Sequence, residues 1–417
     1  TDISPMIGDM QQGSICFGGW ALAIMACGFS GWAGAEEPRV RADHPGGNIR
    51  VLQVKGGEVH LATDLRHLPQ GQSWFYWNFR PADGKGFRAV FFERNHIGVN
   101  GPAVSHDGGA TWEWMGRDRV LEQEHPDDPK RRIWSFEVAP TDDPGSVRYS
   151  FAPQYLQTHL ESWLASHRDD DRLRLTELTK SRKGRSVERI DIGDSPDRAG
   201  SIVLIARQHC CETMGTYVLE GFLEAALADD ETGAYLREQG VTAIPFMDKD
   251  GVEEGDQGKN RAPHDHNRDY NEQPIYPEVR ALMDHIRRHR EDISVFFDLH
   301  CPTVHGEWDN KLYLVGSSLP SVAEAQKAFM PVLAASCRGP VKVREEDLLV
   351  FGMAWNTNAN FSQGKNSGRW VGETLASPTL VSTIEMPYAN SRGVPVTADS
   401  ARAFGRDLAL AVSRLER

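Results

Sequence analysis

Residues 201–227 read SIVLIARQHCCETMGTYVLEGFLEAAL. The opening run, residues 201–206, is apolar and rich in β-branched side chains, as buried strands are. Residues 213–227 carry their apolar side chains at helical spacing and predict a helix. His209 and Glu212 lie between the two, at the turn from strand to helix. A strand, a polar turn and a helix in this order predict one unit of an α/β layered fold, with a binding site at the turn.

The rest of the second half of the chain repeats this alternation. Further strands are predicted at residues 243–247, 293–299, 311–315 and 380–386, and further helices at residues 276–290, 322–335 and 398–415. Strands that alternate with helices predict a mixed, mostly parallel sheet with helices on both faces. Ligands of such sheets bind beyond the carboxyl ends of the strands. His300 follows one of these strands, so we expect it at the same sheet edge as His209.

The first half has a different rhythm. Between residues 48 and 149, short aromatic-rich or alternating runs such as residues 73–80 (SWFYWNFR) are separated by Gly, Asp and Pro turns. Short strands at this spacing predict a small all-β sandwich. A helix predicted at residues 156–167 would link it to the α/β part. We therefore expect a targeting segment at residues 1–35, a β-sandwich domain at residues 36–152 and an α/β domain at residues 153–417.

The composition narrows the class of protein. Hydrophobic residues make up 40% of the 417 residues and charged residues 25%, which is ordinary for a globular chain. The net charge of −13 argues against non-specific binding to nucleic acid or to anionic membranes. The six cysteines form no regular framework and no CxxC pair. The sequence therefore predicts neither a disulfide-dense scaffold nor a cysteine-based structural zinc site.

The N-terminus has features of an export signal. Residues 15–33 are apolar and rich in small residues, and Ala33-Gly34-Ala35 fits a cleavage site, although no Lys or Arg precedes Arg39. Residues 24–27 (IMAC) leave a lipoprotein open, and the length of the run leaves a single membrane anchor open. We expect an exported protein (periplasmic, secreted or lipid-anchored) if this segment is a signal, and a cytoplasmic one otherwise. No other segment is apolar enough to insert stably in a membrane.

His209, Glu212 and His300 are the candidate metal ligands. Two imidazoles and one carboxylate, with a fourth position left open, are typical of a catalytic site that holds one Zn²⁺. The His-x-x-Glu spacing alone recurs by chance, and either histidine alone fits an ordinary hydrogen-bonded polar residue. Both histidines at strand ends of one α/β domain favour the metal site.

The surrounding motifs resemble a known family. Residues 206–215 (ARQHCCETMG) and 218–223 (VLEGFL) resemble the zinc-binding segment of the M14 metallocarboxypeptidases, in particular the cytosolic carboxypeptidase branch that includes tubulin-type deglutamylases. Four further segments resemble that branch in the same order: residues 245–252 (PFMDKDGV), 265–268 (DHNR), 298–300 (DLH) and 383–386 (TIEM). The resemblance covers roughly residues 48–417. It implies a carboxypeptidase-like fold, with residues 153–417 as the zinc carboxypeptidase catalytic domain.

The resemblance implies roles for several residues. Glu385 matches the general base, which takes a proton from the zinc-activated water and passes it to the leaving amine. Arg261 matches the arginine that stabilises the oxyanion, and Lys259 lies close enough for that assignment to move. Asn267 and Arg268 match the pair that holds the terminal carboxylate of the substrate.

One carboxylate is implied as support for the metal. Asp265 matches the aspartate that accepts a hydrogen bond from a zinc-bound histidine, here His209. Such a partner fixes the tautomer of the imidazole. His264, His266 and His305 are expected to be loop residues, because the family needs only three protein ligands.

The chain departs from the family pattern in places. Cys210-Cys211 stands where Pro-Gly is usual, and Cys301 follows the third ligand. These thiols could compete for the metal or pack as small apolar groups, and we favour packing. Digestive members use a tyrosine between the third ligand and the base, but none occurs between Tyr313 and Glu385. Help in the transition state then comes from elsewhere, or that tyrosine is dispensable.

The predicted function is hydrolysis of C-terminal peptide bonds of peptides or proteins. Lys365 and Arg369 lie in the stretch that forms the side-chain pocket in the family, so the resemblance suggests a preference for terminal Glu or Asp. A solvent-facing loop is the alternative for these two residues. A second enzyme hypothesis is an amidase or carboxypeptidase acting on cell-wall peptides. A third hypothesis, a catalytically inactive peptide-binding protein, would need loss of a ligand or of the base, and all are present.

Overall fold

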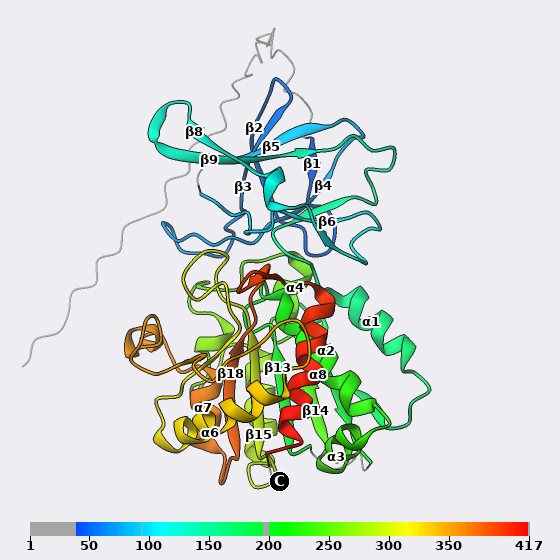
Figure 1. The fold of residues 1–417 in the computed structure, drawn as a ribbon, viewed down its shortest axis with the longest axis vertical. Coiled ribbons are helices and arrows are strands. Elements are labelled where there is room, and N and C mark those ends of the chain that lie inside the picture. Colours follow the sequence, from blue (N-terminus) through cyan, green and yellow to red (C-terminus); the bar gives the residue numbers. More distant parts are fainter. Residues whose placement is uncertain (1–38, 93, 195–199, 416–417) are drawn as a thin grey trace, which may run out of the picture. The chain divides into compact units, whose positions relative to one another are not determined.

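The strand that leads to His209 lies in the middle of an eight-stranded sheet (Figure 1). The computed structural model describes residues 39–92, 94–194 and 200–415. The strands, in spatial order, are β11 (Leu173–Lys180), β12 (Ser186–Ile192), β14 (Val241–Ile244), β13 (Ile202–Ala206), β15 (Val295–His300), β18 (Leu380–Glu385), β16 (Tyr313–Val315) and β17 (Leu348–Leu349). The central strands β14, β13, β15 and β18 are parallel, whereas β11–β12, β12–β14 and β16–β18 pair antiparallel. The predicted mixed sheet is confirmed.

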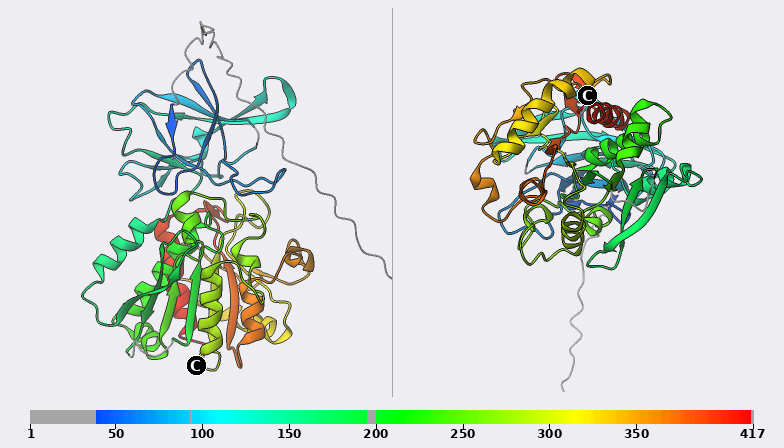
Figure 2. Two further views of the ribbon diagram at one scale, coloured as in Figure 1. Left: turned by 180° about the vertical axis from the view of Figure 1, so that it is seen from behind. Right: turned by 90° about the horizontal axis from the view of Figure 1, so that it is seen from below.

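Alternate side chains of each central strand enter opposite layers. In β13, Leu204 belongs to one apolar cluster and Val203 to another. Most of the buried apolar side chains of the helices α2 (Thr213–Leu227), α6 (Pro320–Ser336) and α8 (Ala398–Val412) belong to the first cluster. Those of α5 (Pro277–Arg288) and α7 (Ser367–Thr374) belong to the second. Figure 1 shows α2 and α8 on one side of the sheet, and Figure 2 (left) shows α5 in yellow-green on the other. The helices therefore cover both faces, as predicted.

The N-terminal part is a β-sandwich. One sheet has the order β1 (Val40–Arg41), β4 (Asn78–Pro81), β10 (Arg148–Ser150), β6 (Ala103–Ser105) and β7 (Glu113–Trp114). The other has the order β2 (Arg50–Lys55), β3 (Glu58–Ala62), β5 (Phe87–Phe91), β9 (Asp128–Val138) and β8 (Leu121–His125). Aromatic rings join the two sheets: Phe136 of β9 stacks on Tyr149 of β10 with 5.9 Å between ring centroids. The predicted small β domain is confirmed.

The sandwich and the α/β layers share hydrogen bonds and an apolar core within residues 38–417. The backbone N–H of Tyr76 donates to Oε1 of Gln257 at 2.8 Å, and Nε2 of Gln257 donates back to the carbonyl of Tyr76 at 2.9 Å. The indole Nε1 of Trp74 donates to Sγ of Cys211 at 3.3 Å, beside the predicted metal ligands. The sandwich is therefore continuous with the site. The boundary at residue 152, before α1 (Gln157–Ser166), stays a prediction.

The predicted targeting segment at residues 1–35 lies outside the described residues, so export stays a prediction. Within the described ranges, none of the helices has the length and apolarity needed to cross a membrane.

Candidate metal centre and active site

The turn after β13 is clamped by a buried arginine. Arg207 has a φ of +63° and a side chain with no solvent exposure. Its Nε donates to the carbonyl of Cys210 at 2.7 Å, and its Nη1 donates to the carbonyl of Tyr155 at 2.8 Å. Glu212 follows as the N-cap residue, directly before the first residue of α2. The turn therefore holds His209 and Glu212 in fixed positions at the carboxyl end of the sheet.

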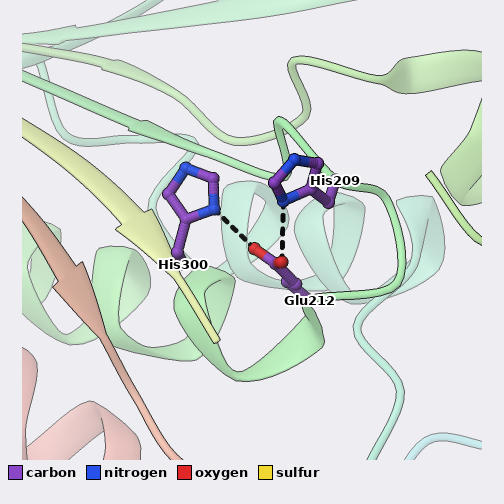
Figure 3. Close-up of side chains that lie close together, drawn as sticks. All are labelled: His209, Glu212 and His300. Carbon is purple, nitrogen blue, oxygen red and sulfur yellow. Dashed lines mark hydrogen bonds and ion pairs between the residues drawn. The ribbon is translucent and has the colours of Figure 1, made fainter. Parts of the chain in front are cut away.

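His209, Glu212 and His300 converge as the sequence predicts (Figure 3). Nδ1 of His209 lies 2.7 Å from Oε1 of Glu212, and Nδ1 of His300 lies 2.7 Å from Oε2 of the same carboxylate. The three candidate ligand atoms lie within 4.8 Å of one another, and all three residues are buried. Two imidazole nitrogens and one carboxylate oxygen at this spacing fit the donor set of a catalytic zinc site.

Each histidine has a carboxylate at its other nitrogen. Nε2 of His209 lies 3.5 Å from Oδ1 of Asp265, and Nε2 of His300 lies 2.9 Å from Oδ2 of Asp298. Burial alone would raise the pKa of Asp265, but the neighbouring His209 lowers it far below its usual range. Both imidazoles are thus oriented with Nδ1 toward the common centre. Sequence reasoning named Asp265 but missed Asp298, which was detectable because residues two apart in a strand share a face.

Glu385 ends β18 beside the metal ligands. It is the register partner of His300 in β15 on one side and of Tyr313 in β16 on the other. Burial raises the pKa of Glu385 to about 8, against the lowering effect of His300 and with a further rise from Glu212. A divalent cation next to it would lower this pKa. Its Oε2 is buried and has no hydrogen-bond partner among the described residues. The oxygen is therefore not taken up by a protein donor in that part of the chain.

A pocket of about 260 Å³ opens onto these side chains, and we call it the metal pocket. Its wall contains the three candidate ligands and Glu385, together with polar and aromatic residues from several elements: Trp74, Lys259, Asn267, Arg268, Asp309, Tyr313, Trp355, Asn360 and Thr383. Tyr313 escaped sequence reasoning, because its approach to Glu385 depends on the antiparallel pairing of β16 with β18. Burial and the negative charge of Glu385 both raise the pKa of Tyr313, so its hydroxyl keeps its proton.

Asn267 and Arg268 lie in the short 3₁₀ helix at His266–Arg268, and both line this pocket. Nδ2 of Asn267 lies 3.2 Å from Nε2 of His300, and Oδ1 of Asn267 accepts a hydrogen bond from the N–H of Ser367 at 3.0 Å. Nε of Arg268 donates to the carbonyl of Asn360 at 3.0 Å. The structure therefore brings both predicted substrate-binding residues to the metal centre.

Arg261 lies elsewhere. Its Nη2 is 2.6 Å from Oδ2 of Asp248 and 3.5 Å from Oδ2 of Asp256, and its side chain lines a separate polar pocket. The backbone turns at Asn260, whose φ is +57°, so the chain sends Lys259 to the metal pocket and Arg261 away from it. Lys259 therefore lines the pocket that holds the candidate metal ligands, and Arg261 lines the separate pocket.

Residues 160–304 match the family model described as zinc carboxypeptidase, peptidase family M14. The chain carries an M14 zinc carboxypeptidase domain. Members of this family are peptidases, so the matched segment indicates a peptidase, which is a hydrolase.

Three similar proteins illustrate the breadth of the likeness. An uncharacterized protein of Zymomonas mobilis is 26% identical over 292 residues, which cover 69% of this chain and 73% of that protein. Cytosolic carboxypeptidase 6 of Caenorhabditis elegans is 24% identical over 284 residues, which cover 61% of this chain and only 59% of the nematode protein. The crystal structure of a metallo-carboxypeptidase from Burkholderia cenocepacia shares the fold, with a TM-score of 0.70 at 19% identity, covering 90% of this chain and 98% of that one.

Arg369 does not line the metal pocket. It lies in α7, and its Nε donates to Oε1 of Glu373 at 3.0 Å. Nζ of Lys365 pairs with the other oxygen of Glu373 at 2.5 Å. Arg369 lines a smaller neighbouring pocket, which shares Thr383 with the metal pocket. The two predicted pocket cations thus compensate one carboxylate rather than line the wall beside the metal ligands.

The cysteines near the M14 metal centre are buried thiols. Sγ of Cys210 donates to the carbonyl of Asp256 at 3.1 Å, and Sγ of Cys211 accepts from Trp74. Burial raises the pKa of the thiols of Cys210, Cys211 and Cys301, with negative neighbours adding to the rise. Among the described residues, the candidate metal-binding group includes none of these cysteines, so their contacts fit packing.

Proposed function

We propose that this protein is a zinc-dependent carboxypeptidase that removes C-terminal residues from peptides or proteins, with one ion held by His209, Glu212 and His300. One observation carries the proposal: this candidate metal-binding triad and Glu385, whose buried Oε2 has no hydrogen-bond partner among the described residues, line the same pocket. Bound zinc would polarise the scissile carbonyl and make water more acidic. The residues around it supply the other requirements of peptide hydrolysis.

Glu385 is the proposed general base. Its carboxylate takes a proton from the attacking water and returns it to the leaving amine. The strand register supports this role, because Glu385 lies directly across from His300 and so beside the ion's place. Burial excludes bulk water from the carboxylate and leaves its Oε2 without a competing hydrogen bond.

Lys259 and Tyr313 are the proposed stabilisers of the negative charge that develops on the carbonyl oxygen. Both line the metal pocket, whereas the guanidinium of Arg261 is taken up by Asp248 and Asp256. A positioned donor of this kind is worth on the order of 3 kcal/mol of barrier. Tyr313 keeps its proton, so its hydroxyl can donate a hydrogen bond.

Arg268 and Asn267 are the proposed readers of the substrate's terminal carboxylate. A planar guanidinium pairs well with two carboxylate oxygens. Arg268 is only 5% exposed and is held by Asn360, which lowers the entropy lost on binding. A buried carboxylate reader in the metal pocket favours cleavage at chain ends over cleavage inside a chain.

The preference for acidic terminal residues stays a prediction. The test is Arg369→Ala, assayed on peptides that differ only in a terminal Glu or Leu. A loss confined to the Glu-ended peptide would support the preference. Equal effects on both peptides, as the pairing of Arg369 with Glu373 would allow, would contradict it.

The experiment for the proposed function compares free and blocked chain ends. The full chain is incubated with a peptide library bearing free C-termini and with the same peptides amidated at the C-terminus. Mass spectrometry should show loss of one residue from the free-ended peptides only, and a chelator should abolish it. Internal cleavage, or equal cleavage of amidated peptides, would contradict the proposal. Peptides with D-centres or diaminopimelate form a further arm, because preferential cleavage of them would favour the cell-wall alternative.

A further inference from the structure

Apolar side chains are exposed together beside the metal pocket. Among the described residues, the large apolar side chains classed as exposed include three within a few positions of one another: Val350, Met353 and Trp355, at 47%, 61% and 39% exposure. We call these three residues the apolar rim. The remaining exposed ones, Leu52, Leu121 and Leu175, lie in separate strands. A local group of exposed apolar side chains marks a binding surface more often than scattered ones do.

The rim is held in place by its own backbone. Asn356 is 1% exposed, and its Nδ2 donates to the carbonyls of Gly316 and Leu349 at 2.8 and 3.0 Å. The N–H of Gly352 donates to the carbonyl of Asn356 at 2.8 Å, which closes the turn around Met353. Figure 1 shows this orange segment extending from the α/β layers. The exposure of the rim is therefore built into a folded turn.

The same segment is continuous with the proposed substrate site. Trp355 lines the metal pocket together with Tyr313. A few residues later, Asn360 accepts the hydrogen bond from Nε of Arg268 and lines the pocket too. Residues 350–364 contain no charged side chain, although the chain as a whole carries a net charge of −13. The surface therefore suits an uncharged, apolar occupant.

We propose that the apolar rim binds an apolar side chain of the substrate upstream of its terminal residue. This inference rests on the proposed function. If Arg268 holds the terminal carboxylate inside the pocket, the preceding residues of the substrate leave through the mouth of the pocket. Trp355 of the rim lines this pocket, and the exposed Met353 and Val350 lie two and five residues before it in the chain. An apolar side chain there would cover Met353 and Val350 and remove their surface from water.

The test uses pairs of peptides that share the terminal residue and differ upstream only in Leu or Ser. The ratio of kcat/KM for the Leu peptide to that for the Ser peptide should exceed one for the wild type. Met353→Ser should lower this ratio roughly threefold to fivefold, as expected for partial burial of one side chain, and should leave hydrolysis of the Ser peptide within about twofold. Leu175→Ser, at another exposed apolar position, on β11, is the matched control and should leave the ratio unchanged.

Two outcomes would overturn the proposed role of the apolar rim. One is an unchanged ratio in both Met353→Ser and Val350→Ser. The other is a change that follows the identity of the terminal residue, which would assign the rim to the terminal side-chain pocket. The Kd values of the Leu and Ser peptides are also measured by fluorescence anisotropy in the Glu385→Gln background, where turnover is not needed, and their ratio is compared between the rim variants. Absence of hydrolysis in the wild type would then contradict the proposed function, while the Kd ratio still decides for or against the rim.

Discussion

His300 and Glu385 are register partners on the parallel strands β15 and β18. The third candidate ligand and the proposed base therefore lie side by side at the carboxyl ends of adjacent strands. Their side chains are fixed by the sheet ladder rather than by a loop, and rigid elements hold a catalytic geometry better than loops do. The same ladder places Tyr313 on the other side of Glu385.

Asp298→Asn should weaken zinc binding by about 10- to 100-fold, because Asp298 orients His300 through a contact of 2.9 Å. The measurement is zinc affinity by competition with a chromophoric chelator. Asp256→Asn is the control, because Asp256 lines the separate pocket with Arg261 and is expected to keep wild-type zinc affinity. Wild-type affinity in Asp298→Asn would contradict the assigned role.

Lys259→Met and Arg261→Met should have different effects. Lys259→Met should lower kcat on the order of 100-fold with zinc content and thermal stability retained, because a donor to the developing oxyanion is lost. Arg261→Met should destabilise the protein by about 3–5 kcal/mol, because it leaves the buried Asp248 without its partner. Steady-state kinetics measures the loss of kcat in Lys259→Met, and urea unfolding measures the loss of stability in Arg261→Met. The account is wrong here if Arg261→Met lowers kcat in a fully stable protein while Lys259→Met is silent.

Stability should fall in acid partly through His285. Burial lowers the pKa of His285 in the folded state to about 4 from the ordinary 6.5, with positive Arg189 adding to the effect. Between these pH values the unfolded chain takes up a proton that the folded chain does not, so the free energy of unfolding decreases as the pH falls from 6.5 to 4. The contribution is on the order of 3 kcal/mol.

The measurement for His285 is urea unfolding across this pH range. His285→Gln, which cannot titrate, should show a shallower dependence of unfolding free energy on pH than the wild type. Taking the difference between the two proteins cancels the contribution of zinc release. Parallel curves for the two proteins would refute the role of His285.

Much of the fold followed from local pattern. Helix α2 begins and ends at the residues predicted, because its apolar side chains are buried all along it. Strands β11 and β12 were missed. β11 lies at the sheet edge and has exposed or half-buried side chains, and β12 (SVERIDI) mixes charged residues with apolar ones. A strand of that kind lacks the continuous apolar run that identified β13 and β15.

The site was predictable where ligands follow strands, and less so where loops decide. His209, Glu212 and His300 were placed by the ends of β13 and β15. The proposed exchange of Arg261 for Lys259 depends on one residue, Asn260, with a positive φ, which no spacing rule predicts. The ion pair of Arg369 with Glu373, which lies one helical turn away, was not considered from the sequence.

The central claim is that one zinc ion, held by the His209–Glu212–His300 triad, is required for carboxypeptidase activity. Its most direct test is a zinc titration of metal-stripped full chain, read as release of the terminal residue from a free-ended peptide. The account predicts that activity is absent without metal, rises linearly and levels off at one equivalent of zinc, with no activity at any zinc level in His300→Ala. Activity that persists without metal, or that needs more than one equivalent, would contradict it.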